Sequence, residues 1–344
     1  MENLRLNVAL LRRKVPNLTS AARSVGLRPA TVSNLCTGKI PVGRAEVRTI
    51  AALASLAECS LDELILMGES VDVIETKIKA LDFFAPVVKG GTIGLVARPG
   101  MGQVVLLSEI FYRLKREGYV TVVLKPDASY PELQELLDDA DAVVHTIEEA
   151  YETMAALPDD KDIVFSADRA HVVTGELYEL QERLQKENLT TFLVDLKGEV
   201  VDEEIPYGPL ETLLHFDADL SARHIFPALN PIYSTSSVLE GAYLDQNHLN
   251  LLQRAQKLLR RYRELRSLVS VRGLTGIPSS ELQTYSRGER LEAYLTQPFY
   301  VAEEFTGTKA ETVSLSDTLN DIRTILEGGA DERSPEELKY IGRL

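Results

Sequence analysis

Between residues 92 and 194, short apolar runs alternate with segments of helical periodicity. A strand of a parallel sheet is covered on both faces, so it reads as a continuous apolar run. The alternation therefore predicts an α/β domain, with a parallel sheet and helices on both faces. The apolar runs lie at 92–97, 120–124, 163–165 and 191–194, and the helical segments at 106–117, 131–138 and 176–187.

A glycine-rich loop follows the first apolar run and leads directly into a helical segment. It reads GLVARPGMGQV over residues 94–104. A strand, such a loop and a helix N-terminus form the phosphate-binding P-loop, whose GxxxxGK[ST] pattern supplies a lysine for phosphates and a hydroxyl for Mg²⁺. Gln103 and Val104 occupy those two positions here. Backbone N–H groups from Arg98 to Gly102 can still cradle a phosphate, but the charge that stabilises phosphoryl transfer is missing.

The N-terminal region has the opposite charge to the rest of the chain. Residues 1–50 carry nine Lys or Arg and two Glu, although the whole chain has a net charge of −15. Such asymmetry indicates a nucleic-acid-binding module attached to an acidic body. Apolar spacing and turn residues predict three helices in this region: one over 4–15 that ends at Pro16, one capped by Thr19 or Ser20 that ends at Gly26, and one from Arg28-Pro29 to Gly38.

The second and third of these helices resemble the phage-repressor (Cro/C1-type) helix-turn-helix family. The matching features are an alanine pair, a Gly-Leu turn, the TVS run and the closing Gly-Lys, followed by an amphipathic segment ending LDELI. In that family the recognition helix enters the major groove. Val32 and Leu35 are expected to face inward, and Pro29 stands where the family usually has glutamine. The resemblance implies that Pro29, Ala30, Thr31 and Asn34 face bases, and that Arg28, Ser33, Lys39 and Arg44 lie near phosphates.

Several longer motifs resemble the nucleotide domain of the F-type ATP synthase beta subunit. They are residues 74–95, FPALNPIYSTSS from Phe226, QPFYVAEEFTG from Gln297, VSLSDTL from Val313 and ILEG from Ile325. The resemblance implies an adenine pocket and places Asp168 at the position of the family's Mg²⁺-associated aspartate. With the glycine loop, the expected nucleotide site consists of Arg98, Gly100, Gly102, Gln103, Val104, Asp168, Phe226, Phe299, Ala302 and Phe305.

The chain departs from that family at points that matter for catalysis. The loop lysine and threonine are replaced, and the helix-turn-helix stands in place of an N-terminal β-barrel. The acidic stretch that contacts the rotating stalk in the family aligns with LTGIPSSE at 274–281, which has little charge. We therefore expect no catalytic residues and no ATPase activity.

Residues 251–269 have apolar side chains at helical spacing and predict a long amphipathic helix. Its other face carries arginines and a lysine, expected either to be solvated or to contact nucleic acid or an acidic neighbouring subunit. The predicted domains are a helix-turn-helix domain over 1–68, all α-helical, a P-loop NTPase-like parallel sheet over 72–235, and an α-helical C-terminal domain over 236–344.

The expected function is that of a DNA-binding transcriptional regulator. Its degenerate body would serve oligomerisation or the sensing of ATP or ADP without hydrolysis. Expected partners are DNA and further copies of the chain, as a dimer, ring or filament. There are three alternatives. The N-terminal region could be a small helical bundle that contacts proteins instead of DNA, and the chain could be a DNA-organising protein that polymerises on DNA or a divergent weak ATPase.

The composition indicates the compartment in which the protein is found. No apolar run approaches the roughly 18 residues that span a bilayer, and two cysteines, Cys36 and Cys59, are typical of a reducing compartment. The five histidines show no metal-binding spacing. We therefore expect a cytoplasmic or nucleoid location, no membrane partner and no bound metal.

Overall fold

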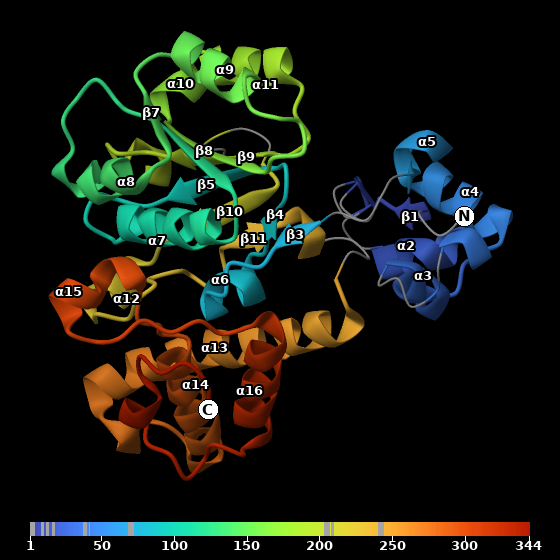
Figure 1. Cartoon of the computed structure of the whole chain (residues 1–344). Coiled ribbons are helices and arrows are strands. Elements are labelled where there is room, and N and C mark those ends of the chain that lie inside the picture. Colours follow the sequence, from blue (N-terminus) through green and yellow to red (C-terminus); the bar gives the residue numbers. More distant parts are fainter. Residues whose placement is uncertain are drawn as a thin grey trace. The chain divides into compact units, whose positions relative to one another are not determined.

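A computed structural model describes residues 4–7, 10–11, 14–15, 18–36, 40, 42–67, 72–202, 207, 210–239 and 244–344. The chain divides into two units (Figure 1). The first contains Met1–Asp72 with Ser237–Asn250, and the second contains Val73–Ser236 with Leu251–Leu344. Each has its own apolar core.

The first unit packs short helices around a small apolar core. Val32, Leu35, Leu53 and Leu64 are among the side chains buried there. Its helices are α2 (Leu18–Ser24), α3 (Pro29–Cys36), α4 (Val47–Leu56) and α5 (Leu61–Leu64), with a 3₁₀ turn at Val42–Arg44.

The first unit contains a two-stranded antiparallel sheet, so the predicted continuous helix over 4–15 and the all-α prediction for this domain are wrong. Strand β1 (Leu4–Leu6) pairs with β2 (Ile65–Met67), so the LDELI segment also ends in a strand. The Asn7 side chain explains why β1 ends where it does. Its Oδ1 accepts the Leu10 N–H at 3.0 Å and its Nδ2 donates to the Glu63 carbonyl. Asn7 is a helix cap, and it separates the strand from the turn of helix that contains Leu10 and Leu11.

The turn between α2 and α3 is specified by Gly26. Its φ of +73° is a left-handed conformation that favours glycine. The Gly26 N–H donates to the Arg23 carbonyl and the Leu27 N–H donates to the Ala22 carbonyl, which is a Schellman arrangement. Helix α3 then begins at Pro29 as predicted, because proline at a first helical position loses no hydrogen bond.

The second unit contains a seven-stranded sheet in the part of the chain that the structure describes. Its order is β11-β10-β5-β9-β8-β6-β7, and every neighbouring pair is parallel except β10 with β11. The predicted parallel sheet is therefore confirmed. The strands are β5 (Thr92–Val96), β6 (Val120–Leu124), β7 (Ala142–Val144), β8 (Ile163–Asp168), β9 (Leu189–Val194), β10 (Thr212–His215) and β11 (Thr235–Ser236), with a separate pair β3 (Val73–Ile74) and β4 (Val87–Val88).

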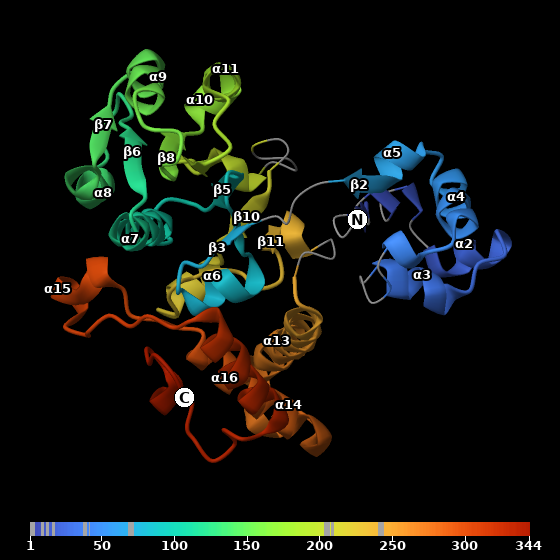
Figure 2. The same ribbon diagram turned by 45° about the vertical axis from the view of Figure 1, so that its right-hand side comes forward.

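Helices cover both faces of this sheet (Figure 1, Figure 2). On one face, Ala150, Met154, Leu177 and Leu180 pack into the core against Phe165. On the other, helix α7 packs on the sheet through Phe111 and Phe192, whose ring centroids are 5.7 Å apart. These helices are α7 (Gln103–Arg116) and α8 (Gln134–Asp139) on one side, and α9 (Ile147–Ala155), α10 (Ala170–Val173) and α11 (Glu176–Leu184) on the other.

A helical group completes the second unit (Figure 2). Gly288 of α14 lies so close to α13 that a Cβ there would be 2.4 Å from the Cβ of Tyr262, so the two helices cross with a small residue at the contact. The helices are α6 (Lys79–Phe84), α12 (Ala218–Ala222), α13 (Gln246–Arg272), α14 (Leu282–Tyr294), α15 (Glu303–Thr306) and α16 (Leu315–Glu327).

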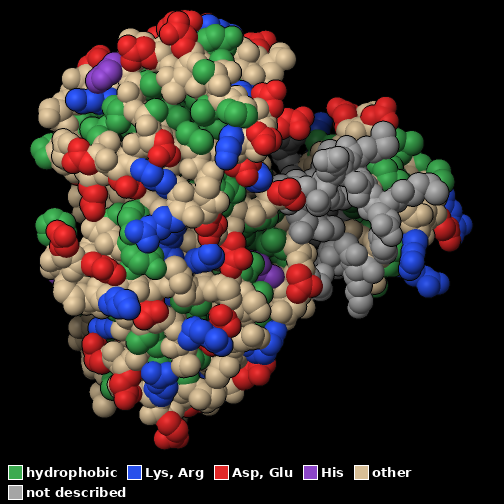
Figure 3. All heavy atoms as spheres, viewed as in Figure 1, with side chains coloured by type: hydrophobic (Ala, Val, Ile, Leu, Met, Phe, Trp, Pro, Cys, Tyr) green, Lys and Arg blue, Asp and Glu red, His purple; other side chains and the backbone are tan. Residues whose placement is uncertain are grey.

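Four arginines on the polar face of α13 form ion pairs with carboxylates of the second unit. Arg261 contacts Glu281 at 2.8 Å and Arg266 contacts Asp219 at 2.5 Å. Arg254 and Arg263 also have carboxylate partners. Across the visible face of the molecule, acidic and basic side chains are interspersed (Figure 3). None of the helices among the described residues combines the length and apolarity needed to span a bilayer.

Candidate functional site

The glycine loop lies at the carboxyl end of β5 and leads into α7. Gly100 and Gly102 have φ values of +82° and +86°, so both positions favour glycine. Helix α7 begins at Gln103, immediately after the left-handed Gly102. The loop therefore joins β5 to the N-terminus of α7 as predicted, although the lysine and hydroxyl side chains are replaced.

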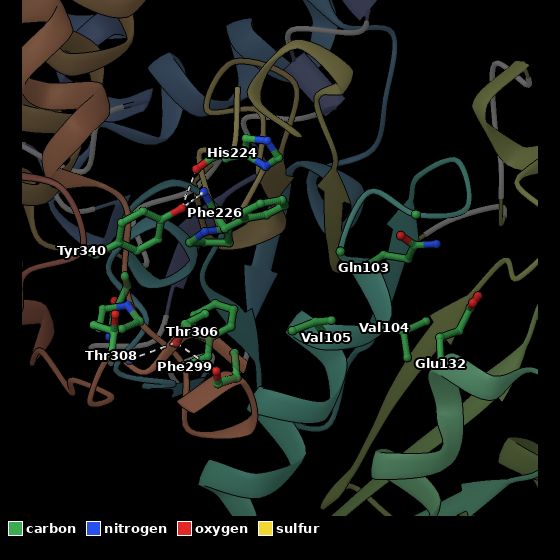
Figure 4. Close-up of a pocket in the computed structure, with 16 residues that line it drawn as sticks. Gln103, Val104, Val105, Glu132, His224, Phe226, Phe299, Thr306, Thr308 and Tyr340 are labelled. Carbon is green, nitrogen blue, oxygen red and sulfur yellow. Dashed lines mark hydrogen bonds between the residues drawn. The ribbon is translucent and has the colours of Figure 1, made fainter. Parts of the chain in front are cut away.

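A cavity of about 580 Å³ opens beside this loop (Figure 4). This volume is within the range of small-molecule sites, about 300–1,000 Å³. Five segments far apart in the sequence form its walls: the glycine loop with the start of α7, the turn at Glu132, the segment around Phe226, residues 297–308 after α14, and Tyr340. The lining residues are Gly100, Gly102, Gln103, Val104, Val105, Glu132, His224, Phe226, Pro227, Gln297, Pro298, Phe299, Ala302, Thr306, Thr308 and Tyr340.

Phe226 and Phe299 give the cavity aromatic walls. The ring of Phe226 lies against the loop, with Cε1 3.4 Å from the place that a Cβ on Gly102 would occupy. Phe299 is 6% exposed and precedes the 3₁₀ turn Tyr300–Ala302. Tyr340 closes another side, because its hydroxyl donates to the His224 carbonyl and accepts the Phe226 N–H at 3.3 Å. These groups suit a flat, apolar ring.

Three polar side chains of the cavity, those of Gln297, Thr306 and Tyr340, are already committed to hydrogen bonds with the backbone. The Gln297 amide donates to the carbonyls of Lys77 and Glu311 and accepts the Lys79 N–H. The Thr306 hydroxyl donates to a backbone carbonyl at 2.9 Å. Gln103 differs: it is 2% exposed, and its side-chain amide has no hydrogen-bond partner within the described ranges. The amide is therefore available as a donor and an acceptor to a ligand.

The charges near the loop are arranged unfavourably for phosphates. Arg98 lies outside the cavity lining, and its Nη2 is 3.1 Å from Oδ1 of Asp202. Arg169 pairs similarly with Glu199 at 3.0 Å. Among the described residues no Lys or Arg lines the cavity, whereas Glu132 does.

The structure brings together most of the residues predicted for nucleotide binding. Arg98, Asp168 and Phe305 lie outside the lining. Asp168 ends β8, and its carboxylate accepts the N–H groups of Ala170 at 2.9 Å and Leu196 at 3.3 Å. Phe305 is 88% exposed. The predicted residues that do line the cavity are Gly100, Gly102, Gln103, Val104, Phe226, Phe299 and Ala302.

Several lining residues escaped the sequence analysis. Gln297 and Thr306 belong to the QPFYVAEEFTG motif and could have been found through it. Glu132 and Tyr340 carry no comparable local signal, since only the folded chain brings them to the loop. In the described part of the chain no three His, Cys, Asp or Glu side chains are grouped as ligands for a metal ion.

The recognition helix predicted in the first unit presents one polar and one apolar side. Val32 and Leu35 are each 2% exposed. Arg28 and Ala30 are exposed, as is Arg44 in the following 3₁₀ turn, whereas Pro29, Thr31 and Asn34 are half-buried. Ser33 lies within α3, and Lys39 lies outside the described residues.

The sheet and glycine loop together define an α/β fold of the nucleotide-binding kind. No family model matches the chain. Among solved structures, the chain is similar to NeqB, described as a unique ATP synthase subunit from Nanoarcheaum equitans, with a TM-score of 0.60 and 15% identity. The match covers 76% of this chain and 77% of NeqB. The chain therefore has a fold like that of an ATP synthase subunit.

Proposed function

We propose that this chain is a DNA-binding transcriptional regulator whose ATP synthase-like body binds an adenine ligand without hydrolysing it. The DNA-binding part of this proposal depends on which sides of α3 are buried and exposed. Its apolar side is buried at Val32 and Leu35, and the side that includes Ala30 faces solvent beside Arg28. Such a helix can place short side chains against base edges while arginines contact phosphates.

The exposed charges of the first unit support this assignment. Arg23 and Arg28 lie at the turn between α2 and α3, and Arg44 lies in the next turn of the chain. Of the exposed acidic residues, Glu46 is paired with Arg48, whereas Glu58 and Asp62 lie around the start of α5. Phosphate contacts supply affinity that does not depend on sequence, so this distribution favours binding through the α2–α3 end.

The cavity of the body supports an adenine ligand. The family resemblance assigns Phe226, Phe299 and Ala302 to an adenine pocket, and the three residues line one cavity beside the glycine loop. Gln103 and Val104 supply neither the charge nor the hydroxyl that phosphoryl transfer uses. We therefore propose a binding role, in which the ligand alters self-association of the chain and thereby its affinity for DNA.

Gel-shift binding of the full chain to genomic fragments around its own gene tests the DNA-binding part. The assay is run at near-physiological salt, with and without ATP. We expect a selective shift that the Thr31→Ala/Asn34→Ala variant loses, whereas the matched Ser55→Ala/Asp62→Ala variant, on exposed positions of α4 and α5, keeps it. Circular dichroism checks that both variants fold. Equal binding to every fragment would contradict a regulator and favour a DNA-organising protein.

Phosphate release from ATP with Mg²⁺ tests the absence of hydrolysis. We expect none above the rate without protein. Release that Asp168→Ala abolishes would overturn the proposal and identify a divergent ATPase.

A further inference from the structure

We propose that the cavity selects against negative charge: it takes an uncharged adenine nucleoside in preference to ADP or ATP, with Gln103 contacting the ligand and Glu132 opposing phosphates. This inference rests on the proposed function, because it takes an adenine ligand as given. It differs from the usual behaviour of a P-loop, in which a lysine makes the phosphates the best-bound part of the ligand.

The first argument is the charge of the lining. Glu132, in the 3₁₀ turn Pro131–Leu133, is the acidic side chain of the cavity, and within the described ranges no Lys or Arg balances it. Glu132 is exposed, so its repulsion of a nearby phosphate acts at short range and is reduced by water and salt. Adding phosphates to the ligand therefore adds repulsion.

Further carboxylates lie next to this turn. Helix α8 begins directly after it, and burial together with the charges of Glu109, Glu304 and Asp139 raises the pKa of Glu135. Glu109 is paired with Arg113 at 2.7 Å and Asp139 with Lys115 at 3.7 Å, so the further negative charge at this side of the cavity comes from Glu135 and Glu304. Arg98 of the glycine loop does not offset this negative charge, because it is paired with Asp202 outside the lining.

The second argument is the free amide of Gln103. It occupies the position of the P-loop lysine, and the residue is 2% exposed. Figure 4 shows Gln103 on the glycine-loop side of the cavity, across from Phe226 and Phe299. A side-chain amide without a hydrogen-bond partner among the described residues is free to donate to and accept from a ligand. An amide offers one acceptor and two donor hydrogens side by side, which match the hydroxyls of a ribose or the edge of a purine. An uncharged nucleoside provides such groups without bringing phosphates to Glu132.

Isothermal titration of the full chain with adenosine, AMP, ADP and ATP, the last two also with Mg²⁺, tests the inference. We expect adenosine to bind at least about tenfold more tightly than ATP, a clear difference in affinity, with AMP and ADP between them. Glu132→Gln should raise the affinity for ADP and ATP by a larger factor than that for adenosine. Glu152→Gln, at an exposed position on α9, is the matched control and should change none of the four affinities.

Substitutions of Gln103 provide an independent readout. Gln103→Ala should weaken adenosine binding, and Gln103→Lys should shift the preference toward ATP, with circular dichroism confirming that each variant folds. Tighter binding of ATP than of adenosine to the unaltered chain would overturn the inference and leave the proposed adenine ligand intact. If none of the four compounds binds, the inference and the adenine part of the proposed function both fail, whereas the gel-shift assay still decides DNA binding.

Discussion

The hydroxyl of Tyr340 accepts the backbone N–H of Phe226 at 3.3 Å and donates to the carbonyl of His224. The two aromatic residues are 114 positions apart in the sequence. Lys79 also binds the segment that contains Tyr340, because its Nζ donates to the Ile341 carbonyl at 2.7 Å. The aromatic wall of the cavity therefore depends on the last residues of the second unit.

Tyr340→Phe should weaken ligand binding as well as the fold. It removes one hydroxyl that both accepts from Phe226 and donates to His224. We expect a loss of about 1 kcal/mol in the free energy of unfolding and a severalfold weaker adenosine affinity, measured by urea unfolding and titration. Tyr178→Phe is the control, since its hydroxyl donates to the Tyr207 carbonyl outside the cavity. It should lower stability alone, and equal affinity losses in both variants would contradict the role of Tyr340.

Lys79 should make stability depend on pH. Burial lowers the pKa of Lys79 from 10.5 to about 7. Between these values the unfolded chain holds a proton that the folded chain has released, so the free energy of unfolding rises with pH, by at most about 1.4 kcal/mol per unit. Lys79→Met removes this contribution. The free energy of unfolding of the unaltered chain, measured with urea, should therefore rise relative to that of Lys79→Met from pH 7 to pH 9.

The control for this prediction is Lys257→Met, at an exposed position of α13. Its pH profile should follow that of the unaltered chain. A Lys79→Met profile parallel to both would show that Lys79 keeps its proton in the folded state throughout this range.

Two ion pairs of the second unit should differ widely in their effect on stability. Glu109 and Arg113 of α7 form a buried pair at 2.7 Å, with side chains 0% and 5% exposed. Glu109→Gln leaves the guanidinium buried without its counter-charge, which costs about 3–5 kcal/mol. Asp202→Asn breaks the exposed pair with Arg98 and should cost less than about 1 kcal/mol. Urea unfolding of both variants measures the two costs, and similar values would contradict the assignment of a buried pair.

Arg28→Ala should weaken DNA binding without changing its sequence preference. Arg28 is exposed immediately before α3, and a phosphate contact there releases counterions on binding. We expect a similar affinity loss on all fragments, with the slope of log affinity against log salt reduced by about 1. Arg254→Ala on α13 serves as the control and should leave the slope unchanged. A loss restricted to one fragment would indicate that Arg28 reads a base.

The sequence by itself determined the elements whose signals are local. The apolar runs at 120–124 and 191–194 are strands because each is buried on both faces. The helix predicted after the glycine loop is α7, which begins at Gln103, three residues before the predicted start. Pro29 marks the start of α3 for an equally local reason. The longer motifs also predicted that Phe226 and Phe299 share a site, and the structure brings both to one cavity.

Only the tertiary structure decided which side chains meet. Leu4 follows a helical spacing in the sequence, yet it pairs with Met67 in a sheet because a strand depends on a distant partner. The ion pair of Arg98 with Asp202 and the approach of Tyr340 to Phe226 likewise join residues separated by 104 and 114 positions. Hydrogen bonds and charges act through space, so the charge and the walls of the cavity emerge only when the chain is folded.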